Sequence, residues 1–136
     1  MKTKILSILA LLLMTVTQGA WAQVTPNLAG EGTQASPYLI ASTTDWNNLS
    51  AAVNGGETYS GKYFKMTANV ATVSTTVGTS ANAFNGTFDG NGHTLNVNIS
   101  NSNVDTRTAP FAWAGGSAVI KNLHENRGDG SDDPLS

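Results

Sequence analysis

Cysteine is absent from the 136-residue chain, and charged side chains make up only 12% of it. Without cysteine, the chain can form neither disulfide bonds nor the lipid-modified N-terminus of a lipoprotein. Small secreted domains usually rely on disulfides, so this chain needs another source of stability, such as a repeating ladder of backbone hydrogen bonds. Gly, Asn, Ser and Thr are plentiful, which is typical of a turn-rich β protein.

Basic residues are also scarce, with 7 Lys and Arg against 9 Asp and Glu. Two of them, Lys2 and Lys4, belong to an N-terminal leader, so the rest of the chain has five basic and nine acidic residues and a net charge of −4. Nucleic acid binding requires a basic patch that neutralises phosphates, so nucleic acid is excluded as a partner. The same balance argues against anionic membrane surfaces, and we expect the mature form to be free of the membrane.

Residues 1–22 have the features of a secretory signal peptide. A positively charged start is followed by an apolar run and then by small residues. Ala20 and Ala22 have one residue between them and fit the pattern of small side chains that signal peptidase recognises. This pattern places the cleavage before Gln23. The apolar run is shorter than the roughly 20 residues that span a bilayer, so a membrane anchor is the weaker alternative. We predict a signal helix at 1–22 and a secreted or outer-surface location.

One helix is predicted in the mature chain, over about 44–54. Ser42 can cap its N-terminus, because a serine side chain accepts a hydrogen bond from the first turn. Trp46, Leu49 and Val53 fall at helical spacing and form one apolar stripe. The pattern therefore predicts an amphipathic helix of about three turns that packs against a core.

The remainder reads as a loop, short strands and a tail. Residues 23–36 are polar and Gly-rich, which predicts a loop. Short strands with alternating side chains are predicted at 37–40, 63–66, 70–77, 93–100 and 119–123. A weak internal repeat relates 92–95 to 117–120, because each is a strand entered from a Gly turn. Residues 124–136 lack an apolar face, so we expect a disordered polar tail.

The segments 30–40, 85–95 and 119–123 together resemble a known family. In order they read Gly-Glu-Gly-Thr followed by Ser-Pro-Tyr-Leu-Ile, then Asn-Gly-Thr-Phe-Asp-Gly-Asn-Gly-His-Thr-Leu, then Val-Ile-Lys-Asn-Leu. This order is similar to the opening of GLUG-motif-type right-handed β-helix proteins, large surface or secreted proteins of Gram-negative gut-type bacteria. The resemblance covers about residues 30–123. It implies an all-β fold, a right-handed parallel β-helix (solenoid) fragment over 37–123 with one N-terminal capping α-helix.

The resemblance also implies a function. Members of this family are taken to be adhesin-like, so we expect an exported, non-catalytic protein whose partner is an extracellular glycan or a host surface protein. The alternative is the N-terminal part of a β-helix polysaccharide lyase or glycoside hydrolase. Family members continue for many more rungs, and 124–136 does not resemble a rung. We therefore expect a truncated chain whose open solenoid end self-associates.

The most conspicuous polar cluster consists of Asp89, Gly90, Asn91, Gly92 and His93. A carboxylate and an imidazole in one turn suit a catalytic or metal site, and sugar-cleaving β-helix enzymes have a similar turn. The structural alternative, which we favour, is a corner between strands where both glycines have positive φ and the polar side chains bond their own backbone. A glycosidase needs two carboxylates, and no pattern places a second one here. We therefore predict no catalytic residue and no enzyme activity.

Other candidate sites are weaker. His93 and His124 lie far apart and have no cysteine partner, so zinc spacing is missing, and we predict no metal and no cofactor. Phe111 and Trp113 can stack on a sugar ring, and a position in the core is the alternative for them. Residues 127–129 spell Arg-Gly-Asp, the tripeptide that integrins read, but so short a motif occurs too often by chance to carry weight.

Overall fold

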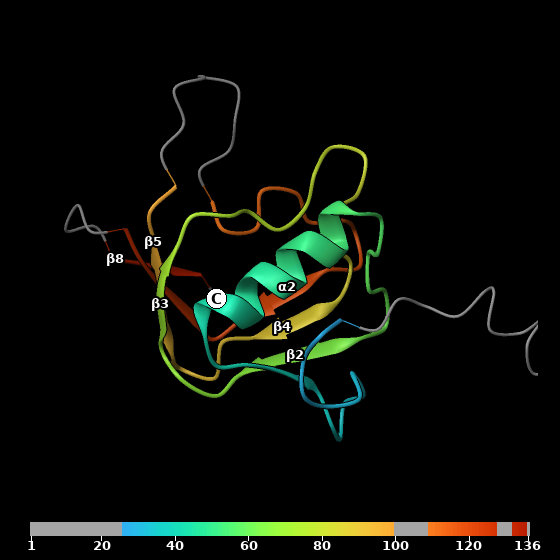
Figure 1. Ribbon diagram of the computed structural model, residues 1–136, viewed down its shortest axis with the longest axis horizontal. Helices are drawn as coiled ribbons and strands as arrows, with labels where there is room; N and C mark the ends of the chain where they lie inside the picture. The colour runs from blue at the N-terminus through green and yellow to red at the C-terminus, as the bar shows by residue number, and fades with distance from the viewer. Residues whose placement is uncertain (1–25, 100–108, 128–131, 136) are drawn as a thin grey trace, which may run out of the picture.

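The computed structural model describes residues 26–99, 109–127 and 132–135. Their strands form two four-stranded sheets, and Figure 1 shows the arrangement. Sheet A consists, in spatial order, of the parallel strands β1 (Tyr38–Ile40), β2 (Tyr63–Met66), β4 (Thr87–Asp89) and β6 (Val119–Lys121). Sheet B consists of the parallel strands β3 (Val70–Val73), β5 (Thr94–Val97) and β7 (Leu123–Asn126), followed by the antiparallel strand β8 (Asp132–Leu135). The chain therefore alternates between the sheets from β2 to β7.

Helix α2 (Thr43–Asn54) follows β1 and confirms the helix predicted over about 44–54. The Ser42 hydroxyl accepts a hydrogen bond from the Asp45 backbone N–H at 3.2 Å. The Asp45 carboxylate in turn accepts from the Ala41 backbone N–H at 2.9 Å. These reciprocal bonds satisfy donors that the first helical turn would otherwise leave unpaired, and they fix where the helix begins.

The polar side chains of α2 attach the helix to the irregular segment after β3. Trp46 donates from Nε1 to the Thr75 carbonyl oxygen at 2.9 Å. Ser50 donates from Oγ to the Thr76 carbonyl oxygen at 2.6 Å. Side chains of the helix thus satisfy backbone carbonyls in a segment that belongs to no strand, and this fixes the position of α2 beside β3.

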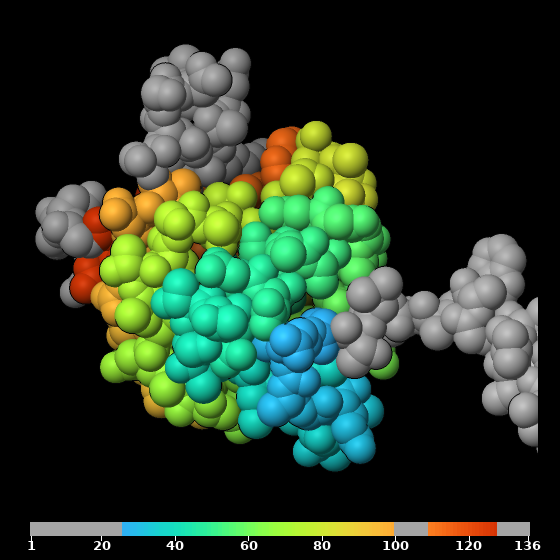
Figure 2. All heavy atoms as spheres, viewed as in Figure 1, coloured from blue at the N-terminus to red at the C-terminus, as the bar shows by residue number. Residues whose placement is uncertain are grey.

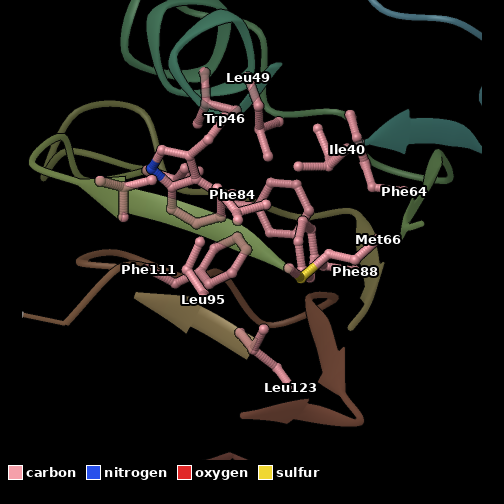
Figure 3. Close-up of a cluster of buried hydrophobic side chains, with 14 of the residues drawn as sticks. Ile40, Trp46, Leu49, Phe64, Met66, Phe84, Phe88, Leu95, Phe111 and Leu123 are labelled. Atoms are coloured by element: carbon pink, nitrogen blue, oxygen red, sulfur yellow. The ribbon is translucent and has the colours of Figure 1, made fainter. Parts of the chain in front are cut away.

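The core lies where α2 and the two sheets meet. Figure 3 shows Trp46 and Leu49 pointing from α2 toward Phe84 and Phe88. All four side chains are fully buried. The Trp46 and Phe88 rings meet edge to face with centroids 5.9 Å apart, a geometry that the quadrupoles of aromatic rings favour. Residues that alternate with core residues along sheet A point outward, and these form the site described below.

The prediction of an all-β right-handed parallel β-helix is wrong. The structure is a mixed α/β-like arrangement in which two small sheets and one helix share the core. The helix is not a cap at the end of a stack, because Trp46, Leu49 and Val53 lie among the core residues with no exposed surface. The apparent repeat also misled, because 92–95 leads into β5 of sheet B whereas 117–120 leads into β6 of sheet A.

The C-terminal residues also differ from the predicted polar tail over 124–136. They contain most of β7 and all of β8, which pairs with β7. In β7, Leu123 and Glu125 are buried while His124 is exposed, so buried and exposed side chains alternate along the strand. The carboxylate of Glu125 lies in an ion pair with Arg127, whose Nε is 2.6 Å from Glu125 Oε1. A charged residue at an inward position concealed the strand pattern in the sequence.

Candidate functional site

The outer face of sheet A carries a row of charged side chains. In β4, Phe88 is buried while Thr87 and Asp89 are half-buried, because successive side chains of a strand point to opposite faces. In the register of the sheet, Lys65 of β2 lies beside Asp89, and Asp89 lies beside Lys121 of β6. The three residues therefore form one row across the sheet, with about 4.8 Å between neighbouring strands.

A groove of about 210 Å³ lies over this row and is named here the sheet A groove. Residues of β2, β4 and β6 line one side, and the loop before β1 lines the other. The lining residues are Gln34, Ala35, Pro37, Tyr63, Phe64, Lys65, Thr87, Asp89 and Lys121. The groove therefore presents two ammonium groups, one carboxylate, one phenol, one hydroxyl and one amide to a ligand.

The loop that borders the groove is held by hydrogen bonds. Glu31 donates its backbone N–H to the Ser36 carbonyl at 3.0 Å, which closes the loop on itself. Tyr63 of β2 donates its backbone N–H to the Gly32 carbonyl at 3.0 Å, which ties the loop to sheet A. Figure 2 shows the residues before β1, in blue, packed against the rest of the molecule. Both sides of the groove are thus fixed relative to each other.

Asp89 is the central residue of the row, and its surroundings favour the ionised carboxylate. Burial alone would raise the pKa of Asp89, but hydrogen bonds from Asn122 and Asn91 and the charges of the two neighbouring lysines outweigh it, so the pKa lies below its usual value. The Asn91 backbone N–H and the Asn122 side-chain amide both donate to Oδ1, at 2.8 and 3.0 Å. Within the described residues no hydrogen bond reaches Oδ2, which leaves this oxygen available to accept from a ligand.

The turn at 89–93 holds Asp89 in place. Positive φ occurs at Asn91 (52°) and Gly92 (75°), whereas the expected positive φ at Gly90 is not observed. Gly90 is required for a different reason, because a Cβ there would lie 2.5 Å from the Asn122 carbonyl oxygen and from Leu123 Cα. The His93 backbone N–H donates to the Gly90 carbonyl at 2.9 Å. The backbone of the turn therefore lies against the β6–β7 connection. His93 is not among the residues that line the groove.

The two rings proposed for ligand stacking, Phe111 and Trp113, occupy different environments. Phe111 is buried, with its ring centroid 5.3 Å from that of Trp46 and 5.0 Å from that of Phe88. Trp113 keeps 40% of its surface exposed. Neither residue lines the sheet A groove. The aromatic residues that line the groove are Tyr63, which points outward from sheet A, and Phe64, which is buried.

The remaining sequence-based candidates are placed as follows. The predicted cleavage residues Ala20, Ala22 and Gln23 lie outside the described residues. In the part of the chain that the structure describes, no group of three His, Cys, Asp or Glu side chains gathers to hold a metal ion. No helix in the same part is long and apolar enough to cross a membrane. Of the Arg-Gly-Asp motif, only Arg127 is described, and it pairs with Glu125.

Sequence reasoning singled out Asp89, favouring a structural role for it in a turn, and missed its partners in the groove. Lys65 occupies an outward position between the buried Phe64 and Met66, and Lys121 is the outward residue after Ile120. That alternation was visible in the sequence. Tyr63 occupies the other outward position of β2. The register that aligns these residues with β4 depends on tertiary contacts, so no signal in the sequence indicated that they would meet.

No family model, curated protein or solved structure matches the chain at a significant level. The resemblance to GLUG-motif-type proteins therefore stays a prediction.

Proposed function

We propose that this is an exported, non-catalytic binding protein that holds an extracellular glycan in the sheet A groove. The observation that carries the proposal is the Asp89 carboxylate, with Oδ1 held by two donors and Oδ2 without a hydrogen bond in the described chain. A carboxylate fixed in this way is a ready acceptor for the hydroxyl groups of a sugar, since hydrogen bonds to a charged acceptor are the stronger kind.

The other groove residues suit the same class of ligand. Lys65 and Lys121 lie on both sides of Asp89, and their ammonium groups are donors that suit sugar oxygens. Tyr63 offers a ring whose face packs on sugar C–H groups and a hydroxyl that donates or accepts. Polar groups beside one outward-facing aromatic ring are what an amphipathic sugar requires.

The properties of Asp89 favour binding over hydrolysis. A general acid needs a pKa near the working pH, so that it carries a proton to give, whereas the Asp89 pKa lies below its usual value. Glycoside hydrolysis also uses a pair of carboxylates. Asp89 is the only carboxylate among the described residues that line the groove.

Export of the protein rests on the leader at 1–22 and is tested separately. We expect material recovered from the culture medium or the outer surface to begin at Gln23. N-terminal sequencing measures this directly. An intact Met1 on the exported chain would overturn the proposal of a cleaved leader.

The binding proposal is tested on a glycan array with the mature chain, followed by calorimetry on the glycans that bind. We expect Asp89→Ala and Tyr63→Ala to weaken binding by about tenfold each, because each removes a direct contact. Glu31→Ala and Trp113→Ala are matched controls, since each removes the same kind of side chain outside the groove. Loss of binding in Trp113→Ala alone would move the site to that face and contradict the proposal.

A reducing-sugar assay on every glycan that binds tests the competing class of function. The proposal predicts no product above the level of a protein-free control. Product that disappears in Asp89→Asn would show a hydrolase or lyase at this groove and overturn the non-catalytic assignment.

A further inference from the structure

We infer that the sheet A groove selects glycans that carry carboxylate or sulfate groups over neutral glycans. This inference rests on the proposed function, because it names the class of glycan that the same groove binds. Its basis is the row of Lys65, Asp89 and Lys121, in which two ammonium groups flank one carboxylate.

The row carries a surplus of one positive charge. The two lysines contribute two positive charges, and Asp89 is ionised and contributes one negative charge. The other described residues that line the groove are uncharged. A neutral glycan leaves this surplus uncompensated, whereas a glycan with acidic groups pairs with it.

The position of Asp89 within the row directs where an acidic group binds. Hydrogen bonds from Asn91 and Asn122 hold the carboxylate at the centre, so its negative charge repels an anion there. Lys65 and Lys121 lie on the two strands that flank β4 and attract an anion on the sides away from Asp89. The sugar hydroxyls then meet Asp89 while the acidic groups meet the lysines.

The spacing of the lysines favours a polymer over a single acidic sugar. Their backbone positions are two strand spacings apart, about 9.6 Å across the sheet. Lys121 is exposed and belongs to the outermost strand of sheet A, so a ligand can extend past it. A chain with recurring acidic groups engages both lysines, while one small anion leaves one of them unpaired.

The negative charge of the whole protein does not cancel this local preference. The chain after the leader carries a net charge of −4. At physiological ionic strength the Debye length is about 8 Å, so charges on the far side of the molecule are screened at the groove. The groove residues decide the electrostatics at contact distance.

The test uses pairs of polymers that share a backbone and differ mainly in charge. The affinity of the mature chain is measured for polygalacturonate and for its fully methyl-esterified form, and for dextran sulfate and for unmodified dextran. We expect at least one acidic member to bind about tenfold more tightly than its neutral counterpart, as two exposed ion pairs imply. The two pairs separate a carboxylate preference from a sulfate preference.

Lysine variants connect the preference to the groove. Lys65→Ala and Lys121→Ala should each weaken binding of the acidic polymer about threefold to fivefold, and added salt should do the same. Lys62→Ala removes the same charge on the residue before β2 but outside the groove, and should leave the affinity unchanged. Circular dichroism of each variant checks that it is folded.

The outcomes separate this inference from the proposed function. Equal affinity for the acidic and neutral forms, with Asp89→Ala still weakening binding, would overturn the charge preference and leave glycan binding intact. An effect of Lys62→Ala as large as that of Lys65→Ala would also overturn it. No binding to these polymers or to any glycan on the array would overturn both.

Discussion

At the scale of single residues, Asp89 links the turn at 89–93 to the sheet A groove. Its Oδ1 accepts hydrogen bonds from Asn91 within the turn and from Asn122 after β6. The same two bonds that organise the backbone also keep the carboxylate ionised. One side chain therefore fixes the local structure and presents a charged acceptor to the groove.

This coupling predicts a pH dependence for the stability difference between the wild type and Asp89→Asn. The folded state lowers the pKa of Asp89, so the stabilisation is present above the unfolded pKa and is lost as the pH falls through the folded pKa. At neutral pH we expect Asp89→Asn to reduce the free energy of unfolding by about 1 kcal/mol, because the bonds lose their charged acceptor. Urea unfolding from neutral to strongly acidic pH should show the difference shrink below about pH 4. A constant difference across that range would contradict the assignment.

Tyr59 makes a second prediction, at alkaline pH. Burial, the Glu57 charge and the nearby Tyr38 raise the pKa of Tyr59 to about 12. Because the folded state raises this pKa, its contribution to stability is complete below the unfolded value of about 10 and falls as the pH rises through the folded value. We expect the wild type to lose stability in this window and Tyr59→Phe to lose less. Identical alkaline denaturation curves for the two proteins would count against this account.

At the scale of elements, helix α2 is held to the sheets by Trp46. The indole is fully buried, contacts the rings of Phe88 and Phe111, and donates a hydrogen bond to Thr75. Among the α2 interactions described above, Trp46 alone combines contacts to other aromatic rings with a hydrogen bond to the segment after β3. The helix should therefore separate from the sheets when this side chain is removed.

Trp46→Ala is expected to reduce the free energy of unfolding by about 3–5 kcal/mol, the cost of deleting a large buried aromatic side chain. Asn47→Ala, on the same helix turn, is the matched control. Asn47 is exposed and accepts one hydrogen bond from Thr75 Oγ1 at 2.8 Å, so its removal should cost about 1 kcal/mol or less. Chemical denaturation of both variants gives the comparison. Equal losses would show that the indole is not the main attachment.

Gly90 in the turn at 89–93 is tested by substitution, with Gly116 as the control. A Cβ at Gly90 would overlap the Asn122 carbonyl oxygen at 2.5 Å, whereas a Cβ at Gly116 meets nothing within 4 Å. We expect Gly90→Ala to destabilise by about 1–3 kcal/mol and to weaken glycan binding, since it displaces the residue that bonds Asp89. Gly116→Ala should leave the melting temperature and the affinity near those of the wild type. A neutral Gly90→Ala variant would contradict the close approach of the turn to the β6–β7 connection.

The local elements were largely predictable, because their signals are local. Ser42, Trp46 and Leu49 indicate the helix through capping and spacing, and the structure has it at Thr43–Asn54. The alternation around Phe64 indicates β2. β7 was missed beyond Leu123 because Glu125 places a charge at an inward position, where its stability depends on Arg127.

At the scale of the whole molecule, the assignment of strands to sheets was not predictable. Thr87 of β4 lies beside Tyr63 of β2 on one side and beside Val119 of β6 on the other. The number of residues from Tyr63 to Thr87 differs from the number from Thr87 to Val119. A search for one fixed repeat therefore related β5 to β6, which lie in different sheets. The predicted fold placed the helix at the end of a stack of rungs, whereas its buried residues share one core with both sheets. The groove depends on this register, so Lys65 and Lys121 could not be found before the structure.

The sheet A edge carries the remaining sequence-based expectation, self-association. β6 is one of the two edge strands of sheet A in the described chain and pairs with β4 on its inner side. Val119 on this strand is 47% exposed. Exposed strand edges are sites of association between chains. Self-association stays a prediction, and sedimentation velocity at rising concentration of the wild type and Val119→Lys measures it.

The most direct test of the central claim, that the outer face of sheet A is the binding surface, is a nuclear magnetic resonance titration. The ¹⁵N-labelled mature chain is titrated with oligogalacturonate, and amide shifts are mapped onto the structure. The account predicts that the largest changes cluster at Tyr63, Lys65, Asp89 and Lys121, and that Asp89→Ala needs about tenfold more ligand to reach the midpoint of the titration. Changes that cluster around Trp113 and leave the sheet A groove unaffected would contradict it.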